Sequence, residues 1–427
     1  MPRFLRFLSS TVAAVGLVGA LSPAAGAQPE RLATRLPLVV IDSPARIADE
    51  PKVTARMRVM DRPGRRVNRR GDPPTAYRGR IGIETRGQLS QTWPKKSFAV
   101  ETRDRRGEDR DVRLLGLPKE SDWILFASYG DRSLMRDALA FAATRRMGRY
   151  APRMRYVELV LNRRYRGVYV LMEPLEIGKR RIDAGKDAVL MELTVPEKVD
   201  PGDETFVSGK GGALVSFADP DPDDLSTAEK ARMRRLVQQF DAALTSADAA
   251  DPARGWRRWL DERSAVDYLL LQELFRNVDA FFASTHLHAT PGGRLVLGPP
   301  WDFDLALGNA TEPWALTTEG WIPSFRPWAS RLKDAGLRRE MLARWRELRA
   351  AGLRERLLAT ADRHARTLRA PARRNFARWP TLSRPPFATQ PVRRSYRDEV
   401  RATKLWLAQR IAWLDGALAQ AAVARGK

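Results

Sequence analysis

The spacing of apolar residues changes from strand-like to helical along this 427-residue chain. The first half contains segments in which apolar residues alternate or run together, as they do in strands: 36–42, 52–60, 77–85, 96–100, 156–161 and 167–172. The last two surround turn residues 162–164 and predict a hairpin. One helix is predicted over 133–147, where Asp131 or Ser133 can cap its start.

Beyond residue 226 the apolar positions recur at helical intervals. The segments with this spacing are 227–243, 264–275, 337–349, 353–368 and 396–424. Residues 196–225 are rich in Pro, Gly and Asp and predict a long loop, and residues 369–393, which contain five prolines, predict an irregular connection. Strands followed by helices predict an α+β fold in two lobes, a β-rich lobe over 36–175 and a helical lobe over 176–427.

Residues 1–27 are typical of a secretory signal peptide. A basic start with Arg3 and Arg6 precedes a small apolar stretch, and Ala25-Gly26-Ala27 matches an A-x-A cleavage site, so cleavage is expected after Ala27. An uncleaved membrane anchor is the alternative, but the apolar stretch is shorter than the roughly 20 residues that a span needs. We therefore expect a protein that is secreted or held at the cell surface, with no transmembrane span.

The composition of the chain excludes several kinds of site and bears on its binding partners. The chain has no cysteine, which excludes disulfides, thiol catalysis and cysteine-bound zinc. Its formal net charge is +24, but the basic residues are spread along the chain rather than gathered in one tail. Charge alone would favour nucleic acid and would predict a strongly salt-dependent affinity for DNA. We expect no specific nucleic-acid partner.

Acidic residues follow two apolar runs in the second half. Asn277 and Asp279 follow the run that ends at Phe275, and Asp302 and Asp304 follow residues 295–297. Ionised carboxylates at the edge of a core need cations, and Mg²⁺ prefers one or two carboxylates together with phosphate oxygens and water. Asp302 and Asp304 would bind the metal, while Asp279 could accept a proton in phosphoryl transfer. The alternative is that these aspartates cap turns or pair with arginines.

The first half offers groups for a nucleotide. Lys95 and Lys96 open a predicted strand, and Lys96 shares a face with apolar residues, as a phosphate-binding lysine would. An exposed edge lysine is the alternative. Arg86, a glycine and Ser90 could form a loop over phosphates. Glu173, at the end of a strand, could lie beside an adenine ring or pair with a basic residue, and the sequence leaves both open.

His286 and His288 are two apart on a possible strand and could bind zinc, but no third ligand stands at a recognisable spacing. We therefore expect two histidines on a half-exposed strand.

Six motifs in order give a resemblance to a known family. They are Arg86-Gly87 with Ser90; Lys95-Lys96-Ser97-Phe98; Arg136; Asn162 to Glu173; Arg276-Asn277-Val278-Asp279; and Gly298-Pro299-Pro300-Trp301-Asp302-Phe303-Asp304. This series resembles the spore coat protein H (CotH) kinase family over residues 36–308, and the likeness extends to residues 344–349.

The resemblance implies an atypical protein-kinase-like fold that transfers phosphate from ATP, with Mg²⁺ or Mn²⁺, to serines of protein substrates such as surface or coat proteins. Lys96 would hold the nucleotide phosphates, with Lys95 and Glu173 nearby, and Arg86 and Ser90 would cover them. Asp279 would be the catalytic aspartate. Asp302 would bind the metal, with Asp304 beside it.

One position departs from the kinase pattern. Ordinary protein kinases have an asparagine five residues after the catalytic aspartate, where it binds the second metal ion. This chain has Ser284 there, and Asn277 or Asp304 would have to compensate. The alternative function is therefore a catalytically inactive surface or coat protein that uses the same fold for binding or adhesion.

Overall fold

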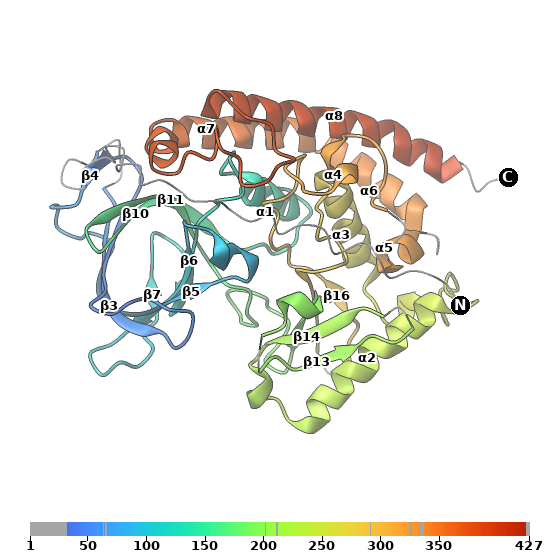
Figure 1. The fold of residues 1–427 in the computed structure, drawn as a ribbon. Coiled ribbons are helices and arrows are strands. Elements are labelled where there is room, and N and C mark those ends of the chain that lie inside the picture. Colours follow the sequence, from blue (N-terminus) through green and yellow to red (C-terminus); the bar gives the residue numbers. More distant parts are fainter. Residues whose placement is uncertain are drawn as a thin grey trace, which may run out of the picture.

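The computed structural model describes residues 32–423, apart from 63, 65, 201, 211, 291, 324–326 and 334–336. The expected signal peptide, residues 1–27, lies outside the described residues. The chain folds as an α+β protein, as predicted, with a barrel on one side, a second sheet beside it and helices across the top (Figure 1).

The first half of the chain forms a closed barrel rather than an open sheet. Its strand order is β10-β11-β9-β6-β5-β3-β2, and the ring closes where β10 pairs with β2 in parallel. The strands are β2 (Leu38–Asp42), β3 (Val53–Met60), β5 (Tyr77–Arg86), β6 (Ser97–Arg103), β9 (Asp122–Phe126), β10 (Met154–Leu161) and β11 (Arg164–Met172). Alternate residues such as Ile81 and Ile83 fill the interior, because successive side chains of a strand point to opposite faces.

The predicted hairpin is β10–β11. Its two-residue turn consists of Asn162 and Arg163, which have φ values of 48° and 64°. Two consecutive residues with positive φ form the tight turn that matches the twist of paired strands. Two short antiparallel pairs accompany the barrel: β1 (Ala33–Thr34) with β4 (Asn68–Arg69), and β7 (Val112–Arg113) with β8 (Lys119–Glu120).

A second sheet lies in the part that was expected to be helical. Its order is β13-β14-β12-β15-β16, with bounds β12 (Val189–Thr194), β13 (Thr205–Val207), β14 (Leu214–Asp219), β15 (Thr285–Ala289) and β16 (Val296–Leu297). The prediction of one long loop over 196–225 is therefore wrong. The prolines of that segment lie outside β13 and β14. Strand β13 has three residues, too few to show an alternation, and the six-residue β14 lies between Gly-rich and Asp/Pro-rich stretches that dominate the composition of the segment.

Each predicted helical segment contains a helix, but one helix is longer than expected, and two short ones at residues 313–316 and 327–332 were not predicted. The helices are α1 (Arg136–Arg146), α2 (Thr227–Thr245), α3 (Glu262–Phe275), α4 (Pro313–Leu316), α5 (Pro327–Leu332), α6 (Arg338–Ala350), α7 (Leu353–Arg378) and α8 (Tyr396–Val423), with short 3₁₀ turns η2 (Leu89–Thr92), η3 (Pro196–Lys198), η4 (Pro222–Asp224) and η5 (Trp256–Arg258). Ser226 and Glu229 form a capping box at α2. No helix in the described part of the chain is both long and apolar enough to cross a bilayer.

Helix α7 corrects the prediction for residues 369–393. It continues through Pro371 to Arg378, so the irregular connection begins about ten residues later than expected. Proline removes one backbone hydrogen bond from a helix. Here the helix packs against β11, α1 and α8, and Pro371 itself is buried, so packing offsets that loss.

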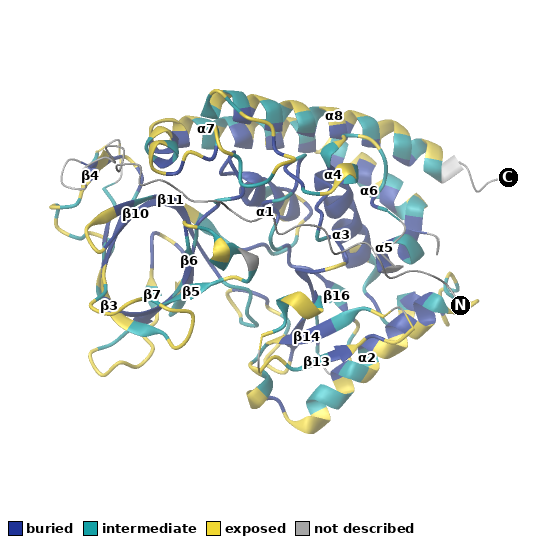
Figure 2. Cartoon of the chain, in the orientation of Figure 1, coloured by how far each residue is buried: buried dark blue, intermediate teal, exposed yellow. Residues whose placement is uncertain are grey.

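The core has two main parts. The barrel encloses its own apolar interior, and a larger cluster joins α1, α3, the second sheet and the helices α6 to α8. The buried faces of these elements turn toward one another, while the outer faces of α2, α7 and α8 are exposed (Figure 2). This arrangement leaves room for a cavity between the barrel and the second sheet.

Candidate functional site

A cavity of about 880 Å³ lies where the barrel meets the second sheet. One wall comes from β5, β6 and β9, and the opposite wall from β12 and β14. Two loops complete it, residues 278–284 after α3 and residues 301–305 after β16. These loops carry Asp279, Asp302 and Asp304, so the fold brings the three aspartates into one cavity.

The end of α3 sets the position of Asp279. Arg276 ends the helix in the left-handed conformation with φ 46°, and its guanidinium donates to the carbonyls of Trp314, Glu319 and Gly320. The chain then turns tightly, since the Ala283 amide donates to the Asp279 carbonyl at 3.1 Å. The Asp279 carboxylate is 19% exposed and faces the cavity.

Asn277 is 1% exposed and is not part of the cavity wall. Its Nδ2 donates to the Asp302 carbonyl at 3.3 Å, and its Oδ1 accepts from the Asp279 amide at 3.4 Å. Both polar atoms of the side chain therefore bind backbone groups. Asn277 thus joins the two aspartate loops from behind the cavity wall, and its expected metal contact stays a prediction.

A turn of the backbone directs Asp302 and Asp304 into the cavity. The backbone at Asp302 is not extended but left-handed, with φ 57°, so a turn presents the two carboxylates. A third carboxylate, Asp137 at the start of α1, joins them and accepts a hydrogen bond from the Phe303 amide at 2.8 Å. Sequence reasoning missed Asp137, because it lies inside a helical pattern far from the acidic motif.

Two of these carboxylates, Asp137 and Asp304, have raised pKa values. Burial, followed by the nearby charge of Asp302, raises the pKa of Asp137 to about 8. Burial and the charges of Asp302, Asp137, Asp131 and Asp279 raise the pKa of Asp304 well above its ordinary value. Such shifts are typical of buried carboxylates that share one site.

The same donor set fits a divalent ion. Among the described residues, no three carboxylate or imidazole groups are placed to hold a metal ion by themselves. An ion bound by Asp302 and Asp304, with Asp137 nearby, would therefore need further oxygen ligands. Mg²⁺ commonly takes such ligands from phosphates and water.

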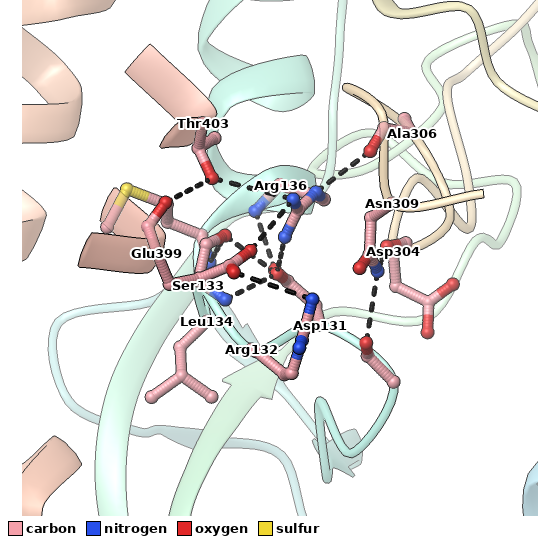
Figure 3. Close-up of polar contacts among 12 residues, drawn as sticks. Asp131, Arg132, Ser133, Leu134, Arg136, Asp304, Ala306, Asn309, Glu399 and Thr403 are labelled. Atoms are coloured by element: carbon pink, nitrogen blue, oxygen red, sulfur yellow. Dashed lines mark hydrogen bonds and ion pairs between the residues drawn. The ribbon is translucent and has the colours of Figure 1, made fainter. Parts of the chain in front are cut away.

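A buried ion-pair network lies directly behind the cluster (Figure 3). Asp131 accepts from the Arg136 amide at 2.8 Å and also pairs with the Arg136 guanidinium, while Glu399 of α8 lies 3.1 Å from the same guanidinium. Arg136 Nε donates to the Ala306 carbonyl at 2.8 Å. The network thus anchors the loop that carries Asp302 and Asp304 to α1 and α8.

The end of β5 forms the expected loop over the cavity. The Arg86 guanidinium lies 5.6 Å from the centre of the Trp301 ring, and Arg86, Gly87 and Ser90 all line the cavity. Gly87 has φ 96°, and a side chain there would lie 2.1 Å from Ser90 Oγ, so only glycine fits. Gln88 Nε2 donates to Asp200, which belongs to the segment after η3.

The structure does not bring Lys95 or Lys96 to the cavity wall. The Lys95 ammonium is buried, 2.5 Å from the carbonyls of both Ala127 and Val168, and burial lowers its pKa well below the ordinary value. The Lys96 ammonium donates to the Gln91 carbonyl. Backbone groups at the edge of the barrel therefore occupy both cations.

Glu173 is also outside the cavity wall. Its carboxylate is fully buried and pairs with Arg153 at 2.6 Å, and it accepts from Tyr150 Oη at 3.1 Å. Of the two alternatives that the sequence left open, the structure shows the pairing with a basic residue.

Lys198 is the cation that sequence reasoning missed. Its Nζ lies 3.4 Å from Asp279 Oδ2 and 3.4 Å from Ser284 Oγ, and it lines the cavity. Burial opposes its charge, but the carboxylates of Asp279, Asp302 and Glu192 raise its pKa. No pattern in the sequence distinguishes this lysine, since it follows a proline in the segment that was expected to be a loop.

The cavity is acidic although the whole chain is basic. Among the residues that line it, Arg86 and Lys198 are the basic ones. The acidic ones are Asp49, Glu50, Glu84, Asp122, Asp137, Glu176, Glu192, Asp200, Asp203, Asp221, Asp279, Asp302, Asp304 and Glu312. A nucleotide would be repelled from such a wall unless divalent cations accompanied it.

His286 and His288 lie on a strand, β15, as expected, but this strand is mostly buried rather than half-exposed, and His286 is among its buried residues. His286 Nε2 is 3.5 Å from Glu192 Oε2, and His288 Nδ1 is 3.2 Å from the Gly298 carbonyl. Burial lowers the pKa of both imidazoles.

The fold and cavity define an α+β protein in which a barrel and a second sheet enclose carboxylates suited to a metal-bound anion. The profile of the family described as CotH kinase protein matches residues 83–414, and the chain belongs to this family. The match includes the three cavity aspartates and Arg86. No curated protein matches the chain.

Proposed function

We propose that this protein is an exported, ATP-dependent protein kinase that phosphorylates serines of surface or coat proteins. Family membership indicates a kinase-like function. The observation that carries the finer proposal is the convergence of Asp279, Asp302 and Asp304 in one cavity. In this proposal the barrel belongs to the N-terminal lobe (36–175) and the rest to the C-terminal lobe (176–427), with the cavity between them.

The proposed reaction uses Asp279 as the base. Its carboxylate takes the proton of the serine hydroxyl, whose oxygen then forms a bond to the γ-phosphorus of ATP. The bond between that phosphorus and the bridging oxygen of ADP breaks, and ADP leaves. The position of Asp279, at the cavity wall and 19% exposed, leaves its carboxylate within reach of an acceptor.

The surrounding residues would bind and orient the nucleotide. Asp302 and Asp304 would hold Mg²⁺ or Mn²⁺, with Asp137 beside them, and the ion would supply positive charge to the phosphates. Arg86, Gly87 and Ser90 would cover the phosphates from the barrel side. Because Lys96 binds the Gln91 carbonyl, we assign it to supporting η2 rather than to direct phosphate contact.

The second candidate is a catalytically inactive binding or adhesion protein. The observation that favours it is Ser284, which stands where ordinary kinases have a metal-binding asparagine. Ser284 lies in the cavity, and its amide donates to Glu192 at 3.1 Å, so its position is fixed by the second sheet.

A phosphoryl-transfer assay separates the two candidates. Purified protein is incubated with labelled ATP, Mg²⁺ or Mn²⁺, and a serine-containing acceptor, beside Asp279→Asn and Asp302→Asn. Loss of the base is expected to lower the rate roughly 10²- to 10⁴-fold. Asp362→Asn is the matched control, because Asp362 pairs with Lys404 between α7 and α8, away from the cavity.

Two results would contradict the kinase proposal. Wild-type protein that transfers no phosphate and gains no thermal stability from nucleotide plus metal would support the inactive alternative. Transfer that continues in both aspartate variants would show that the reaction uses other residues.

A further inference from the structure

We propose that Lys198 is the cation that contacts the transferred phosphoryl group, the part expected from sequence for Lys96. The inference rests on the proposed kinase function and deepens it, because it names a catalytic residue of the same cavity. The Lys198 side chain lies between Asp279, the proposed base, and Ser284, where ordinary kinases have an asparagine.

Lys198 reaches the cavity from the second sheet. It ends η3, which follows β12, and its amide donates to the Val195 carbonyl at 2.8 Å. The side chain is 29% exposed, and its Nζ lies 3.4 Å from both Asp279 Oδ2 and Ser284 Oγ. These are long contacts for an ammonium group, which can donate three hydrogen bonds. Lys198 therefore keeps the capacity to bind an anion at the cavity surface.

Elimination leads to the same residue. Among the residues lining the cavity, the basic ones are Arg86 and Lys198. Arg86 stacks over Trp301 on the barrel side. Lys198 lies against Asp279, where the acceptor hydroxyl must approach. A cation next to the base is suited to the γ-phosphoryl group, whose oxygens share the negative charge during transfer.

The position of Lys198 accounts for a serine, rather than a metal-binding asparagine, at position 284. An asparagine at position 284 would offer an amide oxygen to a second metal ion, as in ordinary kinases. The shorter serine instead accepts a contact from the Lys198 ammonium. A fixed positive charge thus lies where the second ion would otherwise contribute one.

The segment that carries Lys198 is held in place across the cavity. Asp200 accepts from Gln88 on the phosphate-covering loop, and the Asp200 amide donates to Asp203 Oδ2 at 2.8 Å. These contacts join the Lys198 segment to the loop of Arg86 and Ser90. A nucleotide between them would meet cations from both walls.

The catalytic test compares lysine variants. Lys198→Met is expected to lower kcat about 10²- to 10³-fold, the loss typical of one transition-state donor, with a smaller change in the KM for ATP. Lys198→Arg should recover part of kcat, since it keeps the charge. Lys404→Met removes another lysine–aspartate pair, with Asp362, and is the matched control for folding and thermal stability. Lys96→Met tests the rival assignment.

A binding measurement makes the inference testable even if the protein is inactive. Calorimetry with Mg²⁺ compares ADP with a non-hydrolysable ATP analogue. Wild type should prefer the triphosphate, and Lys198→Met should lose that preference while Lys96→Met keeps it. If wild type transfers no phosphate but shows this pattern, the kinase proposal fails, whereas the assignment of Lys198 as the cation that contacts the γ-phosphate stands.

The inference is overturned by any of three results. Lys198→Met could keep more than half of the wild-type kcat in an active enzyme. Lys96→Met, rather than Lys198→Met, could remove the preference for the triphosphate. Wild type could bind neither nucleotide.

Discussion

Two groups of acidic residues lie near the start of α1, and they differ in how closely cations pair with them. Asp131 and Glu399 are paired with Arg136, and Glu399 also lies 3.5 Å from Arg132. Six residues after Asp131, Asp137 faces the cavity, and its pKa is raised to about 8. The pKa of Glu399 is lowered, because the charges of Arg136 and Arg132 outweigh burial. Residue type is therefore a poor guide to role, and the balance of charge around each carboxylate decides it.

The largest effect is expected from a substitution that breaks the ion pairs of Asp131 and Glu399. Arg136→Met leaves Asp131 and Glu399 buried with one cation fewer and releases the Ala306 carbonyl, so the free energy of unfolding should fall by about 3–5 kcal/mol. Denaturant titration measures it. Arg349→Met, which breaks an exposed pair with Asp415, should cost no more than about 1 kcal/mol. Equal losses in the two variants would contradict the structural role of the network.

Removing one negative charge from the carboxylates of the cavity should increase the free energy of unfolding. Asp137→Asn keeps an oxygen to accept from the Phe303 amide but removes a carboxylate among like charges. Without metal, we expect a gain of roughly 1–3 kcal/mol in unfolding free energy at pH 8. Denaturant titration of the variant beside wild type measures this gain. A loss of stability at pH 8 would show that the carboxylates are compensated in the folded protein.

The pH dependence of wild type follows from the same shift. Between about pH 4 and pH 8 the folded protein holds a proton on Asp137 that the unfolded chain has lost. The contribution of this group to stability is therefore complete below pH 4 and is lost as pH rises through 8. Asp137→Asn should flatten this part of the curve of unfolding free energy against pH. An unchanged slope would contradict the assignment.

Binding of Mg²⁺ with ATP in the cavity should raise the melting temperature of the protein by several degrees. Mg²⁺ with ATP is expected to stabilise the protein by roughly 1–3 kcal/mol near saturation, about 2–4 °C per kcal/mol for a chain of this size. Protons compete with the ion for Asp137, so the shift should be larger at pH 8 than at pH 6. Asp302→Asn should remove most of it. A shift that is independent of pH would place the ion elsewhere.

The smallest effect is expected from loss of the hydrogen bond between Gln88 and Asp200, which spans the cavity. Gln88→Ala removes an exposed hydrogen bond to Asp200, worth about 0.5–1 kcal/mol, so the KM for ATP should rise roughly two- to five-fold. Gln238→Ala on α2, which loses an exposed bond to the Val207 carbonyl, is the control. If both variants bind ATP equally well, the contact does not order the nucleotide site.

Much of the fold could be read from the sequence, because apolar periodicity records local structure. The strands at 38–42, 53–60 and 77–86 and the helices at 227–245 and 262–275 lie close to their predicted segments. Closure of the barrel could not be read, since it depends on a parallel pairing of β2 with β10, which are more than a hundred residues apart. Strand β13 was missed because three residues show no period, and β14 was missed because Gly-rich and Asp/Pro-rich stretches surround it.

For the site, the sequence by itself identified the acidic motifs that line the cavity: Asp279 after a buried helix, and Asp302 and Asp304 after a short strand. Only the tertiary structure decided which basic side chains reach the cavity and which are paired elsewhere. It enclosed Lys95 among carbonyls, bound Lys96 to Gln91, turned Glu173 toward Arg153 and brought Lys198 to Asp279. The physical reason is that the ends of apolar runs are visible in a sequence, whereas the partner of a charge depends on which distant segment folds against it.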